Sequence, residues 1–272
     1  MLTYIATEKR HSYHIKYMLL LMGLVTISTS YPCYANKKNA QYSSDEIYSL
    51  GGFVQTSSSE YIGEEKKKSV LPVIGYENEY IKFSGSSIEY KWSKTDISSL
   101  RQVRLRPFIE YDFAGYSSSD SYIFDKMENR RGTLWGGVLA AFEISDYQFE
   151  GKLSHSITNE FSASSVGLQI EKTWQVNQFT LTPRLNIQYS TSEYFDYYYG
   201  VKEDEALSTR PEFEGDAGLI SELGARLTYS MNKTNFLFAD VSTKQLPSAT
   251  EDSPLVDNTT KKIFSIGYIH RF

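Results

Sequence analysis

Few residues of this 272-residue chain are of a type and spacing that suits catalysis. Acyl hydrolysis uses a serine nucleophile beside a histidine base, and His155 next to Ser156 is the one such pair after residue 35. Adjacent side chains of an extended strand point to opposite faces, so neither Ser156 nor Ser154 shares a face with His155. We therefore expect His155 to be an interfacial side chain rather than a base. His270 has no nearby nucleophile and is interpreted in the same way.

Three further clusters have types that could bind a ligand. The acidic run Glu203, Asp204, Glu205 offers hard oxygen ligands for Ca²⁺, although consecutive acids on a loop are more often solvated. The aromatic run 194–199 (YFDYYY) suits either a binding platform or packing over an opening, and the prediction favours packing. The charged run 64–68 (EEKKK) is interpreted as a solvated loop tip.

No Gly-rich phosphate loop and no Cys/His cluster stands in the sequence. We therefore predict no catalytic, cofactor-binding or metal-binding residues, no cofactor, and a protein that is not an enzyme.

Hydrophobicity alternates with a period of two along the segments that carry these residues, which is typical of β-strands. Apolar residues alternate with polar ones over many segments, and the last strand, 261–272, ends on an aromatic residue. The alternating segments are 47–57, 70–77, 103–113, 132–144, 147–157, 165–174, 179–189, 215–230, 234–244 and 261–272. Most run 10 to 13 residues, longer than the usual 5–6 of globular strands and close to the 9–11 of a tilted membrane strand. A secreted β-sandwich also alternates, but it does not need strands of this length.

The connections between these segments alternate in length. The links 58–69, 114–131, 191–214 and 245–260 are long, whereas 145–146, 176–177 and 231–233 are short. The link 159–162 is an exception, because it is short although it falls on the outer side. Outer-membrane barrels have short periplasmic turns and long outer loops. The pattern predicts an all-β fold, a transmembrane antiparallel up-and-down β-barrel. The segment 80–93 forms either two short strands, which gives twelve in all, or a periplasmic excursion, which gives ten. We favour twelve strands.

The N-terminus has the layout of a secretory signal peptide. Basic residues precede an apolar run at 18–27, which is too short to span a membrane, and Cys33-Tyr34-Ala35 offers small residues for cleavage. We predict a cleaved signal peptide at 1–35 and one barrel domain at 36–272. The net charge of the chain is −5, and residues 1–35 carry +2, which leaves −7 for the domain. An acidic exported domain without cysteine is not a nucleic-acid binder and needs no disulfide.

The polar face of the strands carries charges of both signs. Because an unpaired charge in a narrow barrel is costly, we expect these side chains to pair across the lumen and largely to fill it. They are Arg104, Arg106, Glu110, Asp112, Glu150, Lys152, Glu171, Arg184, Glu222, Arg226 and Arg271.

Several stretches resemble the MipA/OmpV family over nearly the whole domain. They are 71–76 (LPVIGY), 197–206 (YYYGVKEDEA), 209–213 (TRPEF), 253–256 (SPLV) and the ending 267–272. His270 departs from the more usual apolar or Tyr-type residue. The resemblance implies an outer-membrane barrel of a Gram-negative bacterium, among the outer-membrane lipids. It also implies a scaffolding role that joins a murein lytic transglycosylase to a bifunctional murein synthase.

The expected contact is on the periplasmic side. The candidate surfaces are 145–146, 176–177, 231–233 and the 78–100 region. Two other functions stay open: a small pore or uptake channel, and an adhesin that uses the outer loops 114–131, 191–214 and 245–260. A hydrolase that uses His155 is the weakest alternative.

Overall fold

A computed structural model describes residues 46–98 and 101–272 of the chain. The predicted signal peptide, 1–35, lies outside these residues. The strands are β1 (Ile47–Ser57), β2 (Lys67–Glu77), β3 (Ile81–Ser84), β4 (Ser87–Tyr90), β5 (Ser93–Ser98), β6 (Arg101–Asp112), β7 (Thr133–Ile144), β8 (Tyr147–Ser156), β9 (Ser164–Lys172), β10 (Trp174–Val176), β11 (Phe179–Ser190), β12 (Gly218–Ser230), β13 (Asn235–Gln245) and β14 (Thr260–Arg271). The helix α2 (Ser192–Tyr199) and three short 3₁₀ turns, η1 (Tyr122–Phe124), η2 (Glu203–Glu205) and η3 (Ser248–Asp252), lie in the outer loops.

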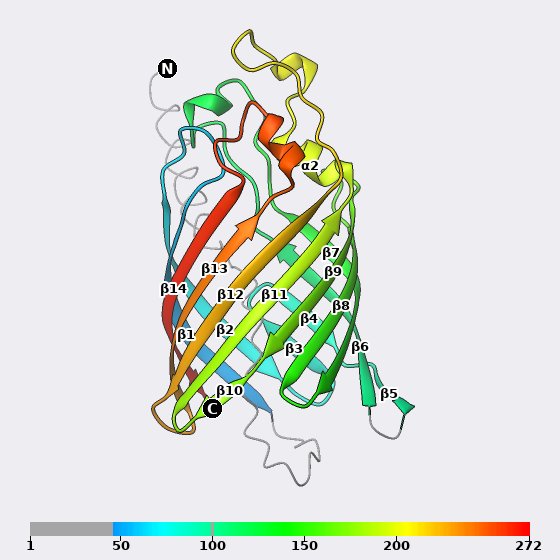
Figure 1. Cartoon of the computed structure of the whole chain (residues 1–272), viewed down its shortest axis with the longest axis vertical. Helices are drawn as coiled ribbons and strands as arrows, with labels where there is room; N and C mark the ends of the chain where they lie inside the picture. Colours follow the sequence, from blue (N-terminus) through cyan, green and yellow to red (C-terminus); the bar gives the residue numbers. More distant parts are fainter. Residues whose placement is uncertain (1–45, 99–100) are drawn as a thin grey trace, which may run out of the picture.

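The sheet closes on itself, because β1 pairs antiparallel with both β2 and β14 (Figure 1). Twelve strands form the ring, in the order β1, β2, β3, β4, β6, β7, β8, β9, β11, β12, β13, β14. β10 pairs with β11 below β9, and β5 pairs with β6 below β4. The prediction of twelve strands is therefore confirmed, and residues 81–90 form the two short strands β3 and β4.

Alternation sorts the side chains to the two faces of the wall. On β14, Phe264, Ile266 and Tyr268 face outward and are exposed, whereas Ser265 and Ile269 face inward and are buried. The outward face therefore carries the apolar band that a bilayer requires. No helix among the described residues is long and apolar enough to cross a membrane.

The connections at the two ends differ as the sequence predicts. Two-residue turns join β7 to β8 and β10 to β11, with Ser145 (φ 57°) and Asn177 (φ 55°) in the left-handed region. At the other end, four long loops leave the wall: 58–66, 113–132, 191–217 and 246–259. These loops gather over the outer mouth of the barrel (Figure 1).

The lumen is filled in two ways. One apolar cluster lies on the inner faces of β1, β2, β13 and β14; its members are Phe53, Leu71, Val73, Phe236, Phe238 and Ile269. Elsewhere charged side chains pair, as predicted. Arg184 contacts Asp240 (2.9 Å) and Glu222 (3.2 Å), and Arg226 also contacts Asp240 (2.9 Å).

The geometry of this pairing differs from the expectation. Arg106 binds Glu89 (2.8 Å) and Lys152 binds Glu110, so each pair joins strands that are adjacent or two apart around the wall. The prediction that these charges pair across the lumen was therefore wrong. Opposite charges already lie close together on the inner faces of neighbouring strands, so they pair along the wall.

Candidate functional site: the outer plug and the lumenal cavity

The aromatic run of the long loop 191–217 forms the helix α2 and packs inward. Tyr194, Phe195, Tyr198 and Tyr199 are buried, whereas Tyr197 is half-buried. These rings therefore pack over the mouth, as the favoured interpretation expected. An exposed binding platform is excluded for the four buried rings.

Rings from two other loops complete this packing. Tyr61 of loop 58–66 makes edge contacts with Tyr116 and Phe124 of loop 113–132 and stacks on Tyr199. Tyr116 and Phe124 stack with their centroids 3.8 Å apart. Aromatic pairs add about 0.5–1.5 kcal/mol each beyond burial of their area. We call the four packed loops, 58–66, 113–132, 191–217 and 246–259, the outer plug.

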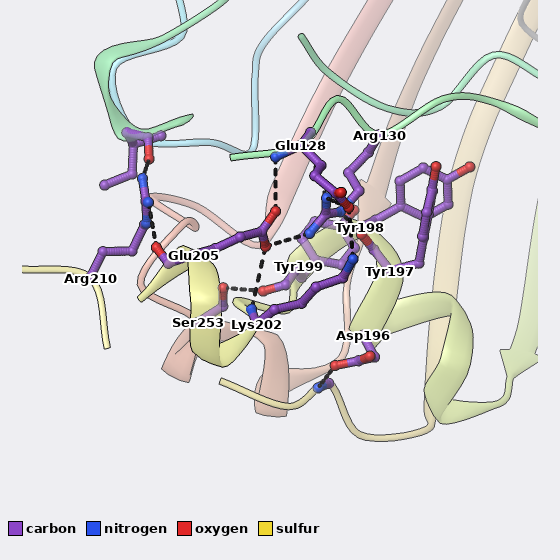
Figure 2. Close-up of polar contacts among 12 residues, drawn as sticks. Glu128, Arg130, Asp196, Tyr197, Tyr198, Tyr199, Lys202, Glu205, Arg210 and Ser253 are labelled. Carbon is purple, nitrogen blue, oxygen red and sulfur yellow. Dashed lines mark hydrogen bonds and ion pairs between the residues drawn. The ribbon is translucent and has the colours of Figure 1, made fainter. Parts of the chain in front are cut away.

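A buried ion pair joins two of the plug loops (Figure 2). Arg130 Nη2 donates to Glu205 Oε2 at 2.6 Å, and both side chains are only 3% exposed. Glu205 also accepts hydrogen bonds from the backbone N–H groups of Glu128 (2.8 Å) and Lys202 (3.3 Å). Both carboxylate oxygens of Glu205 therefore have hydrogen-bond partners within the plug.

Arg210 joins the same loops without a carboxylate partner. It is 2% exposed and donates to the carbonyl oxygens of Asp125 (3.0 Å), Glu205 (2.6 Å) and Ile123. These carbonyls belong to loops 113–132 and 191–217. The guanidinium of Arg210 thus holds two loop backbones together (Figure 2).

Three further hydrogen bonds link the plug loops. Ser253 Oγ donates to the carbonyl oxygen of Tyr199 (2.6 Å), Tyr61 Oη donates to that of Tyr198 (3.2 Å), and Tyr198 Oη donates to that of Arg131 (3.1 Å). All four loops are therefore bonded to one another around α2.

Electrostatics in the plug follow from this burial. Burial raises the pKa of Glu205, but the hydrogen bond from Arg130 and the backbone donors outweigh it and leave the pKa below its usual range. Burial raises the pKa of Tyr61, Tyr194 and Tyr199 well above the usual value of a tyrosine. At neutral pH Glu205 is charged and these tyrosines are neutral.

Beneath the plug lies a cavity of about 440 Å³ in the lumen. Tyr61, Tyr194, Tyr198 and Tyr199 line it from the plug. The barrel wall contributes mainly polar residues, among them Lys67, Ser69, Lys82, Glu110, Gln148, Glu150, Asn186, Gln188, Glu222, Lys244 and Lys261. The plug and the cavity are the two features that offer a site for binding.

The His and Ser residues of the sequence lie as alternation predicts. Ser156 Oγ faces inward and bonds the backbone of Phe161 and Ala163, away from His155. The structure adds a hydroxyl that the sequence reasoning missed, because His155 Nδ1 lies 2.9 Å from Ser164 Oγ. Ser164 stands opposite His155 in the β8–β9 register, and such a partner depends on the register of two strands.

The other sequence candidates are dispersed. Glu203 and Asp204 are exposed, but Glu205 turns into the plug, so the three acids do not converge on one point. His270 Nδ1 contacts Asn235 Oδ1 at 2.8 Å. In residues 46–98 and 101–272 no group of three His, Cys, Asp or Glu side chains gathers as a metal site would require.

The charged run 64–68 is not a wholly solvated tip. Glu64 is 6% exposed in its side chain and contacts Lys67 Nζ at 2.6 Å. β2 already begins at Lys67, so the loop is shorter than predicted. Residues 65–68 are exposed as predicted, whereas Glu64 turns inward and accepts a hydrogen bond from Ser59 of the same loop.

Comparisons with known proteins agree with this architecture. The model of the family described as "MltA-interacting protein MipA" matches residues 50–272. The outer membrane protein OmpV of Vibrio cholerae is 23% identical over 77% of this chain and 80% of its own length. The MltA-interacting protein of Escherichia coli K12 is 20% identical over 94% and 99%. Omp26La, an outer membrane protein of Vibrio anguillarum, is 23% identical over 77% and 80%.

One solved structure that aligns is the NanC porin, at 9% identity and a TM-score of 0.43, over 81% of this chain and 98% of that one. The strand pairing and the names of the relatives place the barrel in the outer membrane.

Proposed function

Because the chain belongs to the MltA-interacting protein MipA family, we propose that this outer-membrane barrel is a scaffold for enzymes that remodel murein. Its periplasmic face would hold a murein lytic transglycosylase and bring it near a bifunctional murein synthase. The name of the Escherichia coli relative, an MltA-interacting protein, supports the first of these partners.

One observation carries the choice of contact surface. β5 pairs with β6 and with no other described strand, so one of its edges is free. It extends below β4 at the periplasmic end of the wall (Figure 1). A free strand edge is a template for an extended peptide of another protein, because its N–H and C=O groups still need partners. This supports the 78–100 region over the three short turns.

The register shows which backbone groups face this free edge. Tyr111 N–H donates to Ser86 O, so alternate residues of β6, including Leu105 and Val103, direct their backbone groups toward β4 and β5. The backbone groups of their partners, Ser93 and Thr95, are directed back toward β6. Lys94, between them, therefore directs its N–H and C=O to the free edge.

The test is photocrosslinking in cells with a photoreactive residue at position 94. A matched residue at position 233, in the turn between β12 and β13, serves as the control. We expect position 94, and not position 233, to capture a lytic transglycosylase. Lys94→Pro removes the N–H at the free edge and should reduce recovery of the transglycosylase while the barrel stays folded.

Unchanged recovery with Lys94→Pro would exclude this edge as the contact. Capture of outer-surface neighbours alone, from positions in the outer loops, would turn the interpretation toward an adhesin.

The plug bears on the pore alternative. Four bonded loops pack over the mouth, and an apolar cluster fills part of the lumen; both features support a scaffold over a channel.

A further inference from the structure

The lumenal cavity has a roof and a wall of different chemistry. The plug rings Tyr61, Tyr194, Tyr198 and Tyr199 form the roof, and Trp135 of β7 lies beside them, with its ring 6.1 Å from that of Tyr194. The hydroxyls of Tyr61 and Tyr198 already donate to carbonyl oxygens of the plug, at 3.2 Å and 3.1 Å. The roof therefore offers the cavity mainly the carbon surface of its rings.

The wall below the roof carries a continuous row of hydrogen-bonding groups. Asn186 of β11 stands opposite Gln169 of β9 on one side and opposite Glu222 of β12 on the other. The strand register extends this row in both directions, and every member lines the cavity: Glu150, Gln169, Asn186, Glu222, Lys244 and Lys261. Carboxylates accept, ammonium groups donate and amides do both, so the row mixes donors with acceptors.

The amide of Asn186 is available to a ligand. Asn186 is half-buried and lines the cavity, and its side chain makes no hydrogen bond within residues 46–98 and 101–272. Buried and half-buried polar groups usually have a partner in the protein or in water. A ligand in the cavity would supply that partner.

A glycine keeps the cavity open above Asn186. Gln188, the next inward residue of β11, stands opposite Gly167 of β9, and Gly167 stands opposite Lys152 of β8. A Cβ at Gly167 would meet no atom nearer than Lys152 Cβ, at 3.6 Å. The space in front of Gly167 is therefore room that a larger side chain would occupy.

The charges that line the cavity nearly balance. The lining contains five lysines and six carboxylates. Four of the lysines contact a carboxylate, and the fifth stands opposite one in the strand register. The pairs are Lys67–Glu64, Lys82–Glu89, Lys152–Glu110, Lys261–Glu60 and, by register, Lys244–Glu222. Because these charges already compensate one another, the cavity does not favour an anion or a cation.

We propose that the cavity binds a short neutral oligosaccharide. A sugar ring has apolar C–H faces, which fit the aromatic roof, and hydroxyl groups that both donate and accept, which fit the mixed row. The cavity volume of about 440 Å³ lies within the range of about 300–1,000 Å³ that small-molecule sites have. The ligand enters when the plug opens. This site goes beyond the scaffold function and does not depend on the periplasmic surface.

Trp135 provides the measurement, because it lies in the cavity. The chain has two other tryptophans, Trp92 and Trp174, which are 69% and 45% exposed. Replacing both by Phe leaves Trp135 as the only fluorescent indole. The protein is placed in lipid nanodiscs without sugar-based detergent and is titrated with lactose, maltotriose and diacetylchitobiose. Lactobionate, which is anionic, and deacetylated chitobiose, which is cationic, are the matched charged probes.

We expect a saturable change in Trp135 fluorescence with at least one neutral probe, and binding of its charged counterpart that is at least about tenfold weaker. Arg130→Met, which loosens the plug, should speed this binding.

Two glycines on neighbouring strands give a matched pair of variants. Gly167→Leu fills the cavity and should abolish binding. Gly151→Leu adds the same side chain to the membrane face of β8, where its Cβ would lie 3.8 Å from Leu168, and should leave binding unchanged.

Asn186→Leu keeps the size of the side chain but removes the amide, and should weaken binding roughly tenfold. Its control is Thr182→Val on the same strand, which lies outside the cavity lining and should have no effect. This pair keeps the test valid if Gly167→Leu does not fold.

Three results would overturn the proposal. The first is no saturable response to any neutral probe, both in the protein with the intact plug and in Arg130→Met. The second is binding of the charged counterparts as tight as that of the neutral probes. The third is binding that survives Gly167→Leu or Asn186→Leu unchanged, because the ligand would then lie elsewhere.

Discussion

The outer plug depends on the buried pair of Arg130 and Glu205, and replacing Arg130 by Met tests this dependence. The change leaves the Glu205 carboxylate 3% exposed and without its cation. Removing one partner of a buried pair costs about 3–5 kcal/mol. At about 1.4 kcal/mol per factor of ten, the population of open plug should rise roughly 100- to 4,000-fold.

Hydrogen exchange of the protein in nanodiscs measures this opening locally. The amides of Val201, bonded to Phe213 O (2.9 Å), and Arg210, bonded to Leu207 O (3.0 Å), belong to the plug. Their exchange should accelerate by the stated factor. Amides of β12 should not change, because the wall does not depend on the pair.

Two companion variants make the result decisive. Lys202→Met removes the exposed pair with Glu128, whose side chains are 56% and 69% exposed, and should change exchange little because surface pairs contribute about 0–1 kcal/mol. The double variant Arg130→Met with Glu205→Leu buries no charge and should restore much of the protection. If Arg130→Met accelerates exchange no more than Lys202→Met, the reasoning is refuted.

Four other outcomes are expected. The plug should loosen in acid. Because the pKa of Glu205 is lowered in the folded protein, its contribution to stability is fully present above the usual value of 4.5 and is lost as the pH falls through the lowered pKa. Hydrogen exchange of the plug amides at pH 3 and at pH 7 checks this. Gly115→Ala should raise plug exchange and protease sensitivity, because Gly115 has φ +116° and a Cβ would lie 2.2 Å from Arg130 O; normal protection would contradict this. The intact barrel should show no steady conductance in planar bilayers, whereas replacing 191–217 by a short turn should raise it; a steady current through the intact protein would favour the pore. His155→Ala and Ser164→Ala should leave lipid turnover in cells unchanged, and a loss in either strain would revive the hydrolase alternative.

Much of the fold followed from the period-two pattern. The segments 47–57, 147–157 and 179–189 became β1, β8 and β11 within one residue at each end. The side chains of a membrane strand alternate between the lipid and the polar lumen. Because these environments differ strongly in polarity, the pattern can be recognised without knowing the neighbouring strands. The doubtful segment 80–93 lacked that signal because β3 and β4 have only four residues each.

The site was less accessible to sequence reasoning. The aromatic run 194–199 indicated packing, but the pairing of Glu205 with Arg130 joins residues 75 positions apart. In the sequence Glu205 is one of three acids that look alike, and only the fold of loop 191–217 turns it inward. The sequence singled out Arg210 only as part of the family-like stretch 209–213 and gave no sign of its role, because its partners are backbone carbonyls.

The chain by itself determined the strands, their inward and outward faces and the lengths of most loops, because these depend on local alternation and on turn residues. The tertiary structure alone decided which charges pair and how the loops close over the mouth. Those features depend on the register between strands and on contacts between distant loops, and neither is encoded in any local pattern.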